Sequence, residues 1–298
     1  MTLSTSTNVG NEMNERRMVD TRLGALAVRV RGEGPVAVLW HSLFVDDKTW
    51  QRVEDDLARL RRLVIITGPG HGASADPGRR YNLDECADAA ADVLAFLGVV
   101  EPVDWVGNAW GGHVGVVFAA SWPDRCRSLI TLGTPIHSYT KSDRLRIWLM
   151  LPVVRLFGPV GFISTGIRDA LLSPTTRAQD PAAGALVVDC LRTMNPAALV
   201  NAVVSISLRR PDLTPRLDQI SCPTLFVTGS DHTDWTPEQA RAASRLLSDG
   251  ATEVIPNVAY LIPLEAHERT LQLVRDLWSQ PLQRRGSDND QHDKTQTP

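Results

Sequence analysis

Short runs rich in β-branched residues recur along the chain, and helical patterns separate them. This alternation is typical of a mostly parallel sheet, because each connection between parallel strands must cross back over the sheet. We therefore predict an α/β fold with flanking helices. The expected strands are Val36–Trp40, Leu63–Thr67, Val103–Gly107, Ser128–Gly133, Thr224–Thr228 and Thr252–Ile255, preceded by a hairpin at Leu23–Val30.

Two segments show the apolar period of an amphipathic helix. Leu83–Leu97 repeats apolar residues at helical spacing directly after Asn82, a residue type that caps helix N-termini. Pro263–Trp278 shows the same period near the end of the chain. We expect one helix at each place.

The alternation of strands and helices stops between Ile136 and Ile220. Apolar helical segments follow one another there without a strand pattern, for example Leu145–Phe157, Ala182–Leu191 and Ala197–Leu208. Open parallel sheets bind ligands at the carboxyl ends of their strands. An insertion of this length therefore predicts a helical cap over the site: residues 136–220 would form the cap, and residues 21–135 and 221–280 the core.

The ends and the charge of the chain restrict its partners. Residues 1–20 and 281–298 are polar and aperiodic, which predicts disordered tails. A net charge of −3 gives no electrostatic footprint for nucleic acid.

The most apolar stretch, Ile147–Ile167, contains Pro152 and Arg155 and so lacks the roughly 18 uninterrupted apolar residues of a membrane span. No apolar segment of the secretory type follows the first basic residues, so we expect a cytoplasmic protein.

The four cysteines show neither paired nor metal-ligand spacing. Each is expected to be a small buried apolar side chain in a reducing compartment. The sequence contains no phosphate-binding loop and no cluster of metal ligands, so we predict no cofactor and no metal. It leaves the oligomeric state open.

Three motifs occur in a fixed order: WHSL at residues 40–43, GPGHGAS at residues 68–74 and VGNAWGG at residues 106–112. Each follows a predicted strand. Together they resemble the α/β-hydrolase superfamily, whose oxyanion loop, PGHGxS turn and nucleophile elbow occur in this order. The resemblance covers roughly Leu23–Ser279 and implies an α/β-hydrolase fold with a helical cap.

The position of the nucleophilic serine in that family holds Ala109 here. Gly107, Gly111 and Gly112 supply the small residues that let strand and helix approach each other at the elbow. A methyl group has no lone pair and cannot attack a carbonyl carbon. Ala109 therefore excludes the ordinary serine-hydrolase mechanism.

The family's histidine position departs as well. Residues 257–265, NVAYLIPLE, match the loop before the last helix and put Tyr260 in the histidine slot. A phenol with a pKa of about 10 is a poor general base at neutral pH. A Ser→Ala variant of an ordinary hydrolase would explain Ala109 alone, so the presence of Tyr260 favours natural divergence.

The position of the family's catalytic acid matches better than those of its serine and histidine. Family acids fall two to three residues beyond the glycine that ends the preceding strand, which makes Asp231 the best match and Asp234 the alternative. Asp231 has lost its usual histidine partner. It is expected either to accept a hydrogen bond from Tyr260 or to be an ordinary loop carboxylate near a helix start.

The resemblance also implies an oxyanion hole made of backbone N–H groups, which does not depend on the nucleophile. Its donors would be Leu43 and Trp110. Ser42 stands where the family usually has glycine, which would narrow or re-aim this loop.

Other polar side chains are candidates for binding or proton transfer. His41 heads the oxyanion loop, where the family uses its side chain to stabilise the loop, and it could also move a proton. Asn108 and Trp110 flank Ala109; both are expected to be architectural, and each could touch a ligand. His232, next to Asp231, is expected to be an exposed loop residue.

Three functions are consistent with these residues. An enzyme could act without covalent catalysis on a small apolar carbonyl or ester-like compound, using the oxyanion hole and a proton carrier among His41, Asp231 and Tyr260. A pseudo-hydrolase could bind a small apolar molecule without turnover. A Ser→Ala variant of an ordinary hydrolase would regain esterase activity when Ala109 becomes serine. The retained polar frame favours the enzyme.

Overall fold

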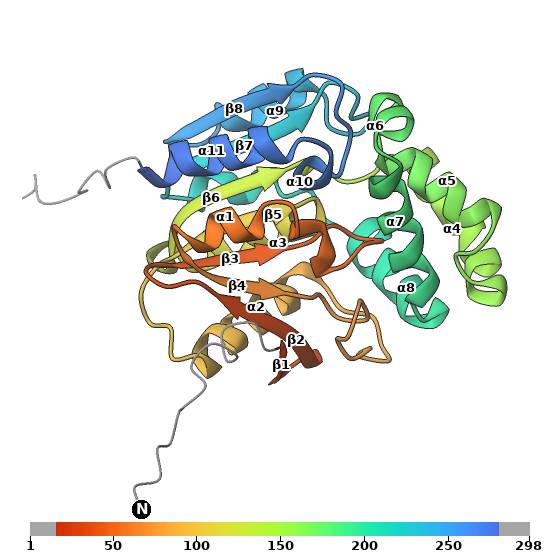
Figure 1. Ribbon diagram of the computed structural model, residues 1–298, viewed down its shortest axis with the longest axis horizontal. Helices are drawn as coiled ribbons and strands as arrows, with labels where there is room; N and C mark the ends of the chain where they lie inside the picture. Colours follow the sequence, from red (N-terminus) through yellow and green to blue (C-terminus); the bar gives the residue numbers. More distant parts are fainter. Residues whose placement is uncertain (1–15, 280–298) are drawn as a thin grey trace, which may run out of the picture.

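An eight-stranded sheet forms the centre of the computed structural model, which describes residues 16–279 (Figure 1). The strand order is β1-β2-β4-β3-β5-β6-β7-β8. The β1–β2 and β2–β4 pairs are antiparallel, and all other pairs are parallel. The strands are β1 (Arg16–Thr21), β2 (Gly24–Arg31), β3 (Val36–Trp40), β4 (Arg62–Ile66), β5 (Val103–Asn108), β6 (Cys126–Leu132), β7 (Thr224–Gly229) and β8 (Gly250–Ile255). The predicted mostly parallel sheet and its six main strands are confirmed, with ends that differ by at most two residues.

The start of the sheet corrects two predictions. Leu23–Val30 is not a hairpin: it contains most of β2, which pairs with β1. Residues 16–20, predicted to belong to a disordered tail, lie in β1. This edge strand is polar, and of its side chains only Val19 is fully buried, so composition alone gave no strand signal. Residues 1–15 and the predicted tail at 281–298 lie outside the described residues.

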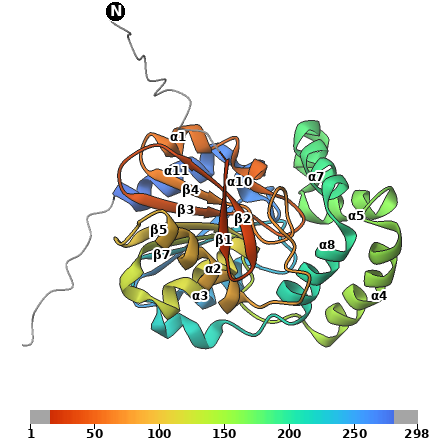
Figure 2. The ribbon, with the colours of Figure 1, turned by 90° about the horizontal axis from the view of Figure 1, so that it is seen from below.

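Helices cover both faces of the sheet (Figure 2). One face packs against α2 (Leu83–Phe96), α3 (Trp110–Ser121) and α9 (Pro237–Ser244), and the other against α1 (Glu54–Ala58) and α11 (His267–Ser279). Strand β3 illustrates why: Val38 and Trp40 join the first apolar cluster, whereas Ala37 and Leu39 join the second. Side chains alternate between the two faces of a strand, and burial on both faces explains the continuous apolar run.

Helix α2 begins as predicted. Asn82 accepts a hydrogen bond from the Glu85 N–H at 2.8 Å, and the Glu85 carboxylate accepts one from the Asn82 N–H at 3.0 Å. This reciprocal pair is a capping box, which satisfies two N–H groups that a helix start leaves unpaired.

The single helix predicted at Pro263–Trp278 is divided in two. A short helix α10 (Ile262–Glu265) ends at Ala266, whose backbone leaves the helical region, and α11 then begins at His267. Apolar periodicity continues across the break, which is why the sequence suggested one helix.

Between β6 and β7 the described chain contains helices and no strand. They lie beyond the carboxyl ends of the parallel strands (Figure 1). The predicted helical segment Ala197–Leu208 is confirmed, but its hydrogen-bond pattern changes within it: α8 ends at Ala202 and a π-helix, η4, continues to Leu208. The elements are α4 (Lys141–Phe157), α5 (Phe162–Leu171), α6 (Pro174–Gln179), α7 (Pro181–Thr193), α8 (Pro196–Ala202), η4 (Val203–Leu208) and the 3₁₀ helix η5 (Thr214–Gln219). Among residues 16–279, no helix is long and apolar enough to cross a membrane.

Candidate active site at the turn after strand β5

The turn between β5 and α3 holds Ala109 at its tip. Its backbone angles are φ 46° and ψ −100°, a region that residues with a side chain rarely occupy. Space around the turn is minimal: a Cβ atom on Gly107 would overlap the backbone of Gly111, and one on Gly112 would overlap the Thr134 hydroxyl. Glycines are therefore required at these positions, and the strained elbow geometry is present although its tip is alanine.

Two backbone N–H groups are free in the described part of the chain, one in the residue after Ala109 and one in the loop after β3. The Ala109 N–H itself donates to the Leu132 carbonyl at 2.8 Å. Trp110 is the first residue of α3, and neither its N–H nor that of Leu43 has a partner within residues 16–279. These are the two N–H groups that the sequence predicts as oxyanion donors. They can donate to a ligand oxygen, and their joint action remains a prediction.

Hydrogen bonds fix the loop that carries Leu43 on both sides of that residue. Ser42 is buried and its hydroxyl donates to the Leu43 carbonyl at 3.3 Å, while Phe44 adopts a left-handed φ of 72°. Beyond the loop, Asp46 caps the 3₁₀ helix η2 (Asp47–Trp50) by accepting the Lys48 N–H at 3.0 Å.

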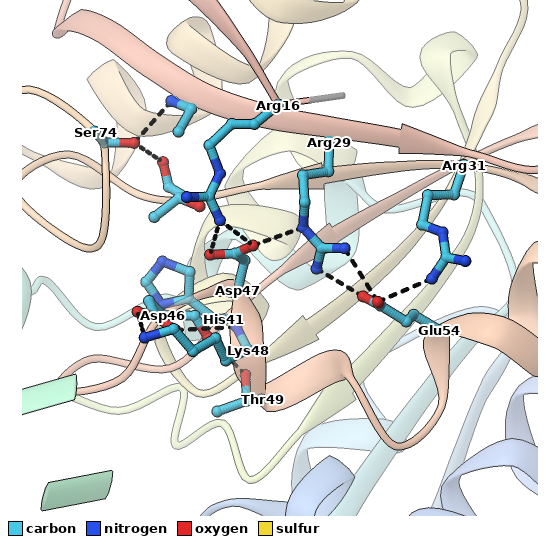
Figure 3. A network of polar contacts seen from close by, with 12 residues as sticks. Arg16, Arg29, Arg31, His41, Asp46, Asp47, Lys48, Thr49, Glu54 and Ser74 are labelled. Carbon is cyan, nitrogen blue, oxygen red and sulfur yellow. Dashed lines mark hydrogen bonds and ion pairs between the residues drawn. The ribbon is translucent and has the colours of Figure 1, made fainter. Parts of the chain in front are cut away.

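An ion-pair network fixes this end of the loop to the sheet (Figure 3). The buried Asp47 carboxylate contacts Arg29 at 2.7 Å and Arg16 at 3.1 Å, and Arg29 also contacts Glu54 at 2.6 Å. Burial opposes ionisation of Asp47, but its bonds to Arg29 outweigh burial and lower its pKa. The network thus ties the loop to strands β1 and β2.

His41 is buried with both ring nitrogens occupied. Its Nδ1 lies 2.7 Å from the Ser42 carbonyl, and its Nε2 accepts the Gly68 N–H at 2.8 Å. This requires a neutral imidazole that donates from Nδ1, and burial correspondingly lowers the pKa of His41. His41 stabilises the loop and has no nitrogen free to move a proton.

The side chains that flank Ala109 are architectural. The Asn108 amide group donates to the carbonyls of Leu132 and Tyr260, both at 2.8 Å, and so joins the turn to the Tyr260 loop. Its Oδ1 is buried without a partner among the described residues. The Trp110 ring is fully buried beside Trp40, with centroids 5.5 Å apart in an edge-to-face arrangement. Trp110 can therefore donate a hydrogen bond to a ligand from its backbone N–H group, whereas its buried indole ring is out of reach.

Tyr260, in the expected histidine slot, presents a protonated phenol. Its hydroxyl lies 2.9 Å from the Thr233 hydroxyl, and its N–H donates to the Leu171 carbonyl of helix α5 at 3.3 Å. Burial, reinforced by the nearby Asp234 carboxylate, raises the pKa of Tyr260 well above that of a free phenol. Tyr260 can donate a hydrogen bond or a proton but cannot act as a base near neutral pH.

The Tyr260 loop is held by one carboxylate. Glu265 accepts the N–H groups of Ala259 and Leu261, both at 3.1 Å. It also accepts the Ser173 N–H at 2.7 Å and the Thr176 hydroxyl at 2.9 Å. The carboxylate thereby connects the loop to helix α6. This bonding also explains why the helix predicted at Pro263–Trp278 breaks after Glu265.

The two candidate acids change places relative to the sequence prediction. Asp231 accepts a hydrogen bond from the Ser230 hydroxyl at 2.9 Å, and within the described chain none reaches it from Tyr260. Of the two alternatives predicted for Asp231, the bond from Tyr260 is wrong, and its contact with Ser230 fits an ordinary loop carboxylate. Asp234, the alternative, is the carboxylate whose charge acts on Tyr260.

His232 is also not the exposed residue that we expected. It is buried, its ring lies 3.7 Å from the Tyr260 ring centroid, and its Nδ1 accepts the Asp234 N–H at 3.2 Å. Its Nε2 lies 3.3 Å from the Gly133 carbonyl. Burial lowers the pKa of His232 to about 4, so this ring is neutral near pH 7. Adjacency to Asp231 in sequence gave no signal of this inward orientation.

A buried cation that the sequence did not reveal lies behind the turn. Arg210 contacts the His113 Nε2 at 3.1 Å, donates to the His137 carbonyl at 2.8 Å and stacks 4.9 Å over the Tyr139 ring. No carboxylate lies within ion-pair distance of it in the described part of the chain. Its position after an apolar helical run gave no indication of burial.

An apolar cavity of about 480 Å³ lies beside the site, between the helices that follow β6 and the loop that carries Leu43 and Phe44. Phe44, next to Leu43, lines it on one side, and Leu171, the carbonyl partner of Tyr260, lines it on another. Ala109 and Tyr260 are not themselves part of its wall. Among residues 16–279, no group of three or more His, Cys, Asp or Glu side chains could hold a metal ion.

Comparison with known proteins gives a consistent picture. A model of the alpha/beta hydrolase family matches residues 37–273. Over 131 residues the chain is 30% identical to the 2-hydroxymuconate semialdehyde hydrolase of Pseudomonas sp. (strain CF600), which covers 43% of this chain and 44% of that protein. The chain thus spans less than half the length of that relative.

Two further proteins match over most of their length. The 2-(acetamidomethylene)succinate hydrolase of Mesorhizobium japonicum is 23% identical over 267 residues, 87% of this chain and 93% of that protein. The solved structure of a thermophilic esterase from Thermogutta terrifontis is similar with a TM-score of 0.82 and 26% identity, and covers 88% of this chain and 97% of that one.

Proposed function

The chain belongs to the alpha/beta hydrolase family, and from this premise we propose that it acts on a small apolar carbonyl or ester-like compound without a covalent serine intermediate. Relatives that match it are hydrolases and esterases by name. The proposed mechanism uses no serine nucleophile, because Ala109 occupies the tip of the turn where that serine would lie.

One observation carries the proposal: the strained turn at Ala109 is kept, and the N–H groups of Leu43 and Trp110 are free. A turn that served only as a connection would have no need of strain that costs roughly 1–3 kcal/mol. Backbone N–H groups fixed by such a turn can stabilise negative charge that develops on a carbonyl oxygen. This contribution does not require a nucleophile on the protein.

The proton carrier in this mechanism is Tyr260. Of the three candidates, His41 has both nitrogens occupied and Asp231 bonds to Ser230, away from the phenol. Tyr260 is protonated and half-buried, and it can donate toward a substrate oxygen or leaving group. The chemistry that fits is hydrolysis in which the oxyanion donors polarise the carbonyl and water adds to the carbonyl carbon. Tyr260 protonates the leaving group as its bond to that carbon breaks, and the proton that the water loses returns to the phenolate.

The apolar cavity supports the substrate class. Its volume of about 480 Å³ falls in the range of small-molecule sites, roughly 300–1,000 Å³. Its wall is almost entirely aliphatic and aromatic, with Arg146 the single charged residue. A small apolar body would fill it while a carbonyl group reached the oxyanion loop past Phe44.

A second function, binding without turnover, is favoured by one specific observation. The site lacks an imidazole base: the rings of His41 and His232 are fully hydrogen-bonded, and the expected histidine slot holds Tyr260, a phenol with a raised pKa. A reaction that needs proton abstraction by a histidine would then fail. The fold would serve as a pocket for the same class of compound.

The test is turnover of short- and medium-chain p-nitrophenyl esters by the unmodified chain and by Tyr260→Phe, Ala109→Ser and Ala109→Ser/Tyr260→His variants. Turnover by the unmodified chain that Tyr260→Phe abolishes would support the non-covalent enzyme. Silence of the unmodified chain, together with saturable quenching of its tryptophan fluorescence by the same esters, would support binding alone. Full esterase activity of Ala109→Ser without a change at Tyr260 would contradict both and identify a substituted hydrolase.

A further inference from the structure

Helices α4 and α5 expose an unusual amount of apolar surface. Eight of the thirteen large apolar side chains that residues 16–279 expose lie between positions 145 and 162. Trp148 is 60% exposed and Phe162 76%. The set, named here the outer apolar face, consists of Leu145, Trp148, Leu149, Met150, Leu156, Phe157, Val160 and Phe162. Met150 and Phe162 lie at its edge, because they also line the larger apolar cavity. Patches this dense are rare on monomers and mark contact surfaces.

Helical geometry makes α4 apolar on two opposite sides. Leu145, Trp148 and Leu149 share one side because residues three and four apart lie above one another. Ile147, Leu151 and Val154 have the same spacing on the other side and line the apolar cavity. A helix that covers a core on one side normally presents polar residues on the other. The outer side of α4 therefore lacks the polar residues that a helix surface facing water normally has.

Basic side chains border this face, and they are unpaired. Arg144, Arg155 and Lys141 in α4, and the neighbouring Arg80 and Arg209, make no ion pair with any described residue. Most arginines elsewhere do, for example Arg22, Arg29 and Arg61. Asp143 is the only acidic residue of α4. A basic rim on a chain of net charge −3 is a local feature that complements an anionic partner.

A second cavity adjoins the face. Its volume is about 310 Å³, and its wall includes Trp148, Leu151 and Leu208 together with the guanidinium-bearing Arg80 and Arg209. An apolar interior bordered by two free cations matches a molecule with an apolar chain and an anionic head. Residues of the basic rim and of the outer apolar face thus meet in one site.

We propose that the outer apolar face docks on the surface of an anionic lipid bilayer, with α4 lying in the interface plane. Apolar and aromatic side chains of the face enter the boundary between head groups and acyl chains, and the basic rim contacts lipid phosphates. Symmetric pairing of two copies through this face would bring the same cations together, which disfavours a dimer. Because the inner side of α4 lines the larger cavity, docking would also place that cavity next to the lipid. The inference does not depend on the proposed reaction.

The experiment is co-sedimentation of the full chain with vesicles of phosphatidylcholine alone and of phosphatidylcholine with 30% phosphatidylglycerol (on the order of the anionic content of natural membranes). We expect binding only to the anionic vesicles, and release on raising the salt concentration. Lys141→Glu/Arg155→Glu and Leu149→Ser/Phe157→Ser should each lower the partition coefficient about tenfold or more. All four positions are exposed, and circular dichroism verifies the fold of each variant.

The matched control is Arg17→Glu/Arg245→Glu, which makes the same change in net charge at exposed cations of β1 and of the loop after α9. This variant should bind as the unmodified chain does. Failure of the unmodified chain to bind anionic vesicles at low salt would overturn the proposal, as would equal losses in the control and in the face variants. A dimer in solution that Leu149→Ser/Phe157→Ser dissociates, without vesicle binding, would assign the face to a second copy instead.

Discussion

The imidazole of His232 packs against the phenol of Tyr260, with the two ring centroids 3.7 Å apart and the ring planes tilted by 32°. A histidine therefore does lie beside Tyr260, the residue predicted to occupy the family's histidine slot, but it comes from the loop after β7 and is neutral. Its two nitrogens bond to the backbone of Gly133 and Asp234, so it supports the phenol rather than replacing the missing base. The packed pair makes Tyr260 the group through which the loop can act on a ligand.

Replacing Tyr260 by phenylalanine separates the role of the ring from that of the hydroxyl. Tyr260→Phe keeps the ring contact with His232 and loses the hydroxyl with its contacts to Thr233 and Asp234. We expect the free energy of unfolding to change by about 1 kcal/mol or less. Turnover of a substrate should fall about 10²–10⁴-fold, because a positioned proton donor is lost.

Measurements of kcat/KM and of urea unfolding on the same preparations test this. Tyr139→Phe is the matched control, since its phenol faces Arg210 instead. Unchanged turnover in Tyr260→Phe would remove Tyr260 from the mechanism.

The close contact between Gly111 and the backbone of Trp40 predicts that a larger residue at position 111 destabilises the protein severely. A Cβ atom on Gly111 would overlap the carbonyl oxygen of Trp40, and the Gly111 N–H bonds to the His41 carbonyl at 3.1 Å. Both atoms belong to backbone that cannot move without opening the sheet. Gly111→Ala should therefore lower the free energy of unfolding by more than about 3 kcal/mol or prevent folding.

Gly166→Ala in helix α5 is the matched substitution, because nothing lies within 4 Å of a Cβ atom there. It should leave stability unchanged or raise it by up to about 1 kcal/mol. Chemical denaturation of both variants decides. Equal stability of the two would show that the turn is not packed as described.

The sequence predicts the core of this fold because the physical signals there are local. The five residues of β3 are β-branched or apolar and fully buried, and the glycines around Ala109 are demanded by contacts within one turn. The edge strand β1 escaped prediction because its stability comes from pairing with β2 and from the Arg16–Asp47 contact, which join distant positions.

The site was harder to predict for the same reason. Motif positions predicted a tight turn at Ala109, which the structure has, and a site role for Tyr260, which stays a prediction. The partners of Tyr260 depend on how the loop after β7 turns. Asp231 and Asp234 differ by three positions, and no periodicity distinguishes which carboxylate faces the phenol. Arg210 bonds to His113 across 97 positions, a contact that no local pattern encodes.

Removing a charge from the ion-pair network around Asp47 should lower both the stability of the protein and its affinity for a ligand (Figure 3). Asp47→Asn removes the charge that Arg29 and Arg16 share, and it leaves the Arg29 guanidinium, only 14% exposed, without one of its two carboxylates. We expect a loss of roughly 2–4 kcal/mol in the free energy of unfolding at pH 7. Ligand binding should weaken as well, since η2 follows the Leu43 loop directly.

Asp88→Asn is the control, because its pair with Arg22 is solvent-exposed and should contribute less than about 1 kcal/mol. Thermal unfolding and ligand titration of the two variants provide the comparison. A loss in Asp88→Asn as large as that in Asp47→Asn would contradict the structural role of the buried network.

Buried imidazoles predict that mild acid destabilises the protein. Burial lowers the pKa of His71 to about 3 and that of His232 to about 4, and it lowers those of His41 and His113 too. A histidine in the unfolded chain takes up its proton near pH 6.5. Below that pH the unfolded state binds more protons than the folded state, so stability is highest above pH 6.5 and falls as the pH decreases toward the folded pKa values.

The slope between pH 6.5 and 5 should approach roughly 1.4 kcal/mol per pH unit for each neutral buried imidazole. Unperturbed carboxylates titrate mainly near pH 4, below this window. The buried Glu265, whose pKa is raised by burial, acts in the opposite direction to the histidines. Urea unfolding at pH 7.5, 6.0 and 5.0 measures the slope, and His232→Phe should reduce it by about one proton because phenylalanine cannot titrate. A free energy of unfolding that stays constant from pH 7.5 to 5.0 would mean that these rings are protonated in the folded protein. The neutral His232 beneath Tyr260, and with it the proton-donor role of that phenol, would then have to be abandoned.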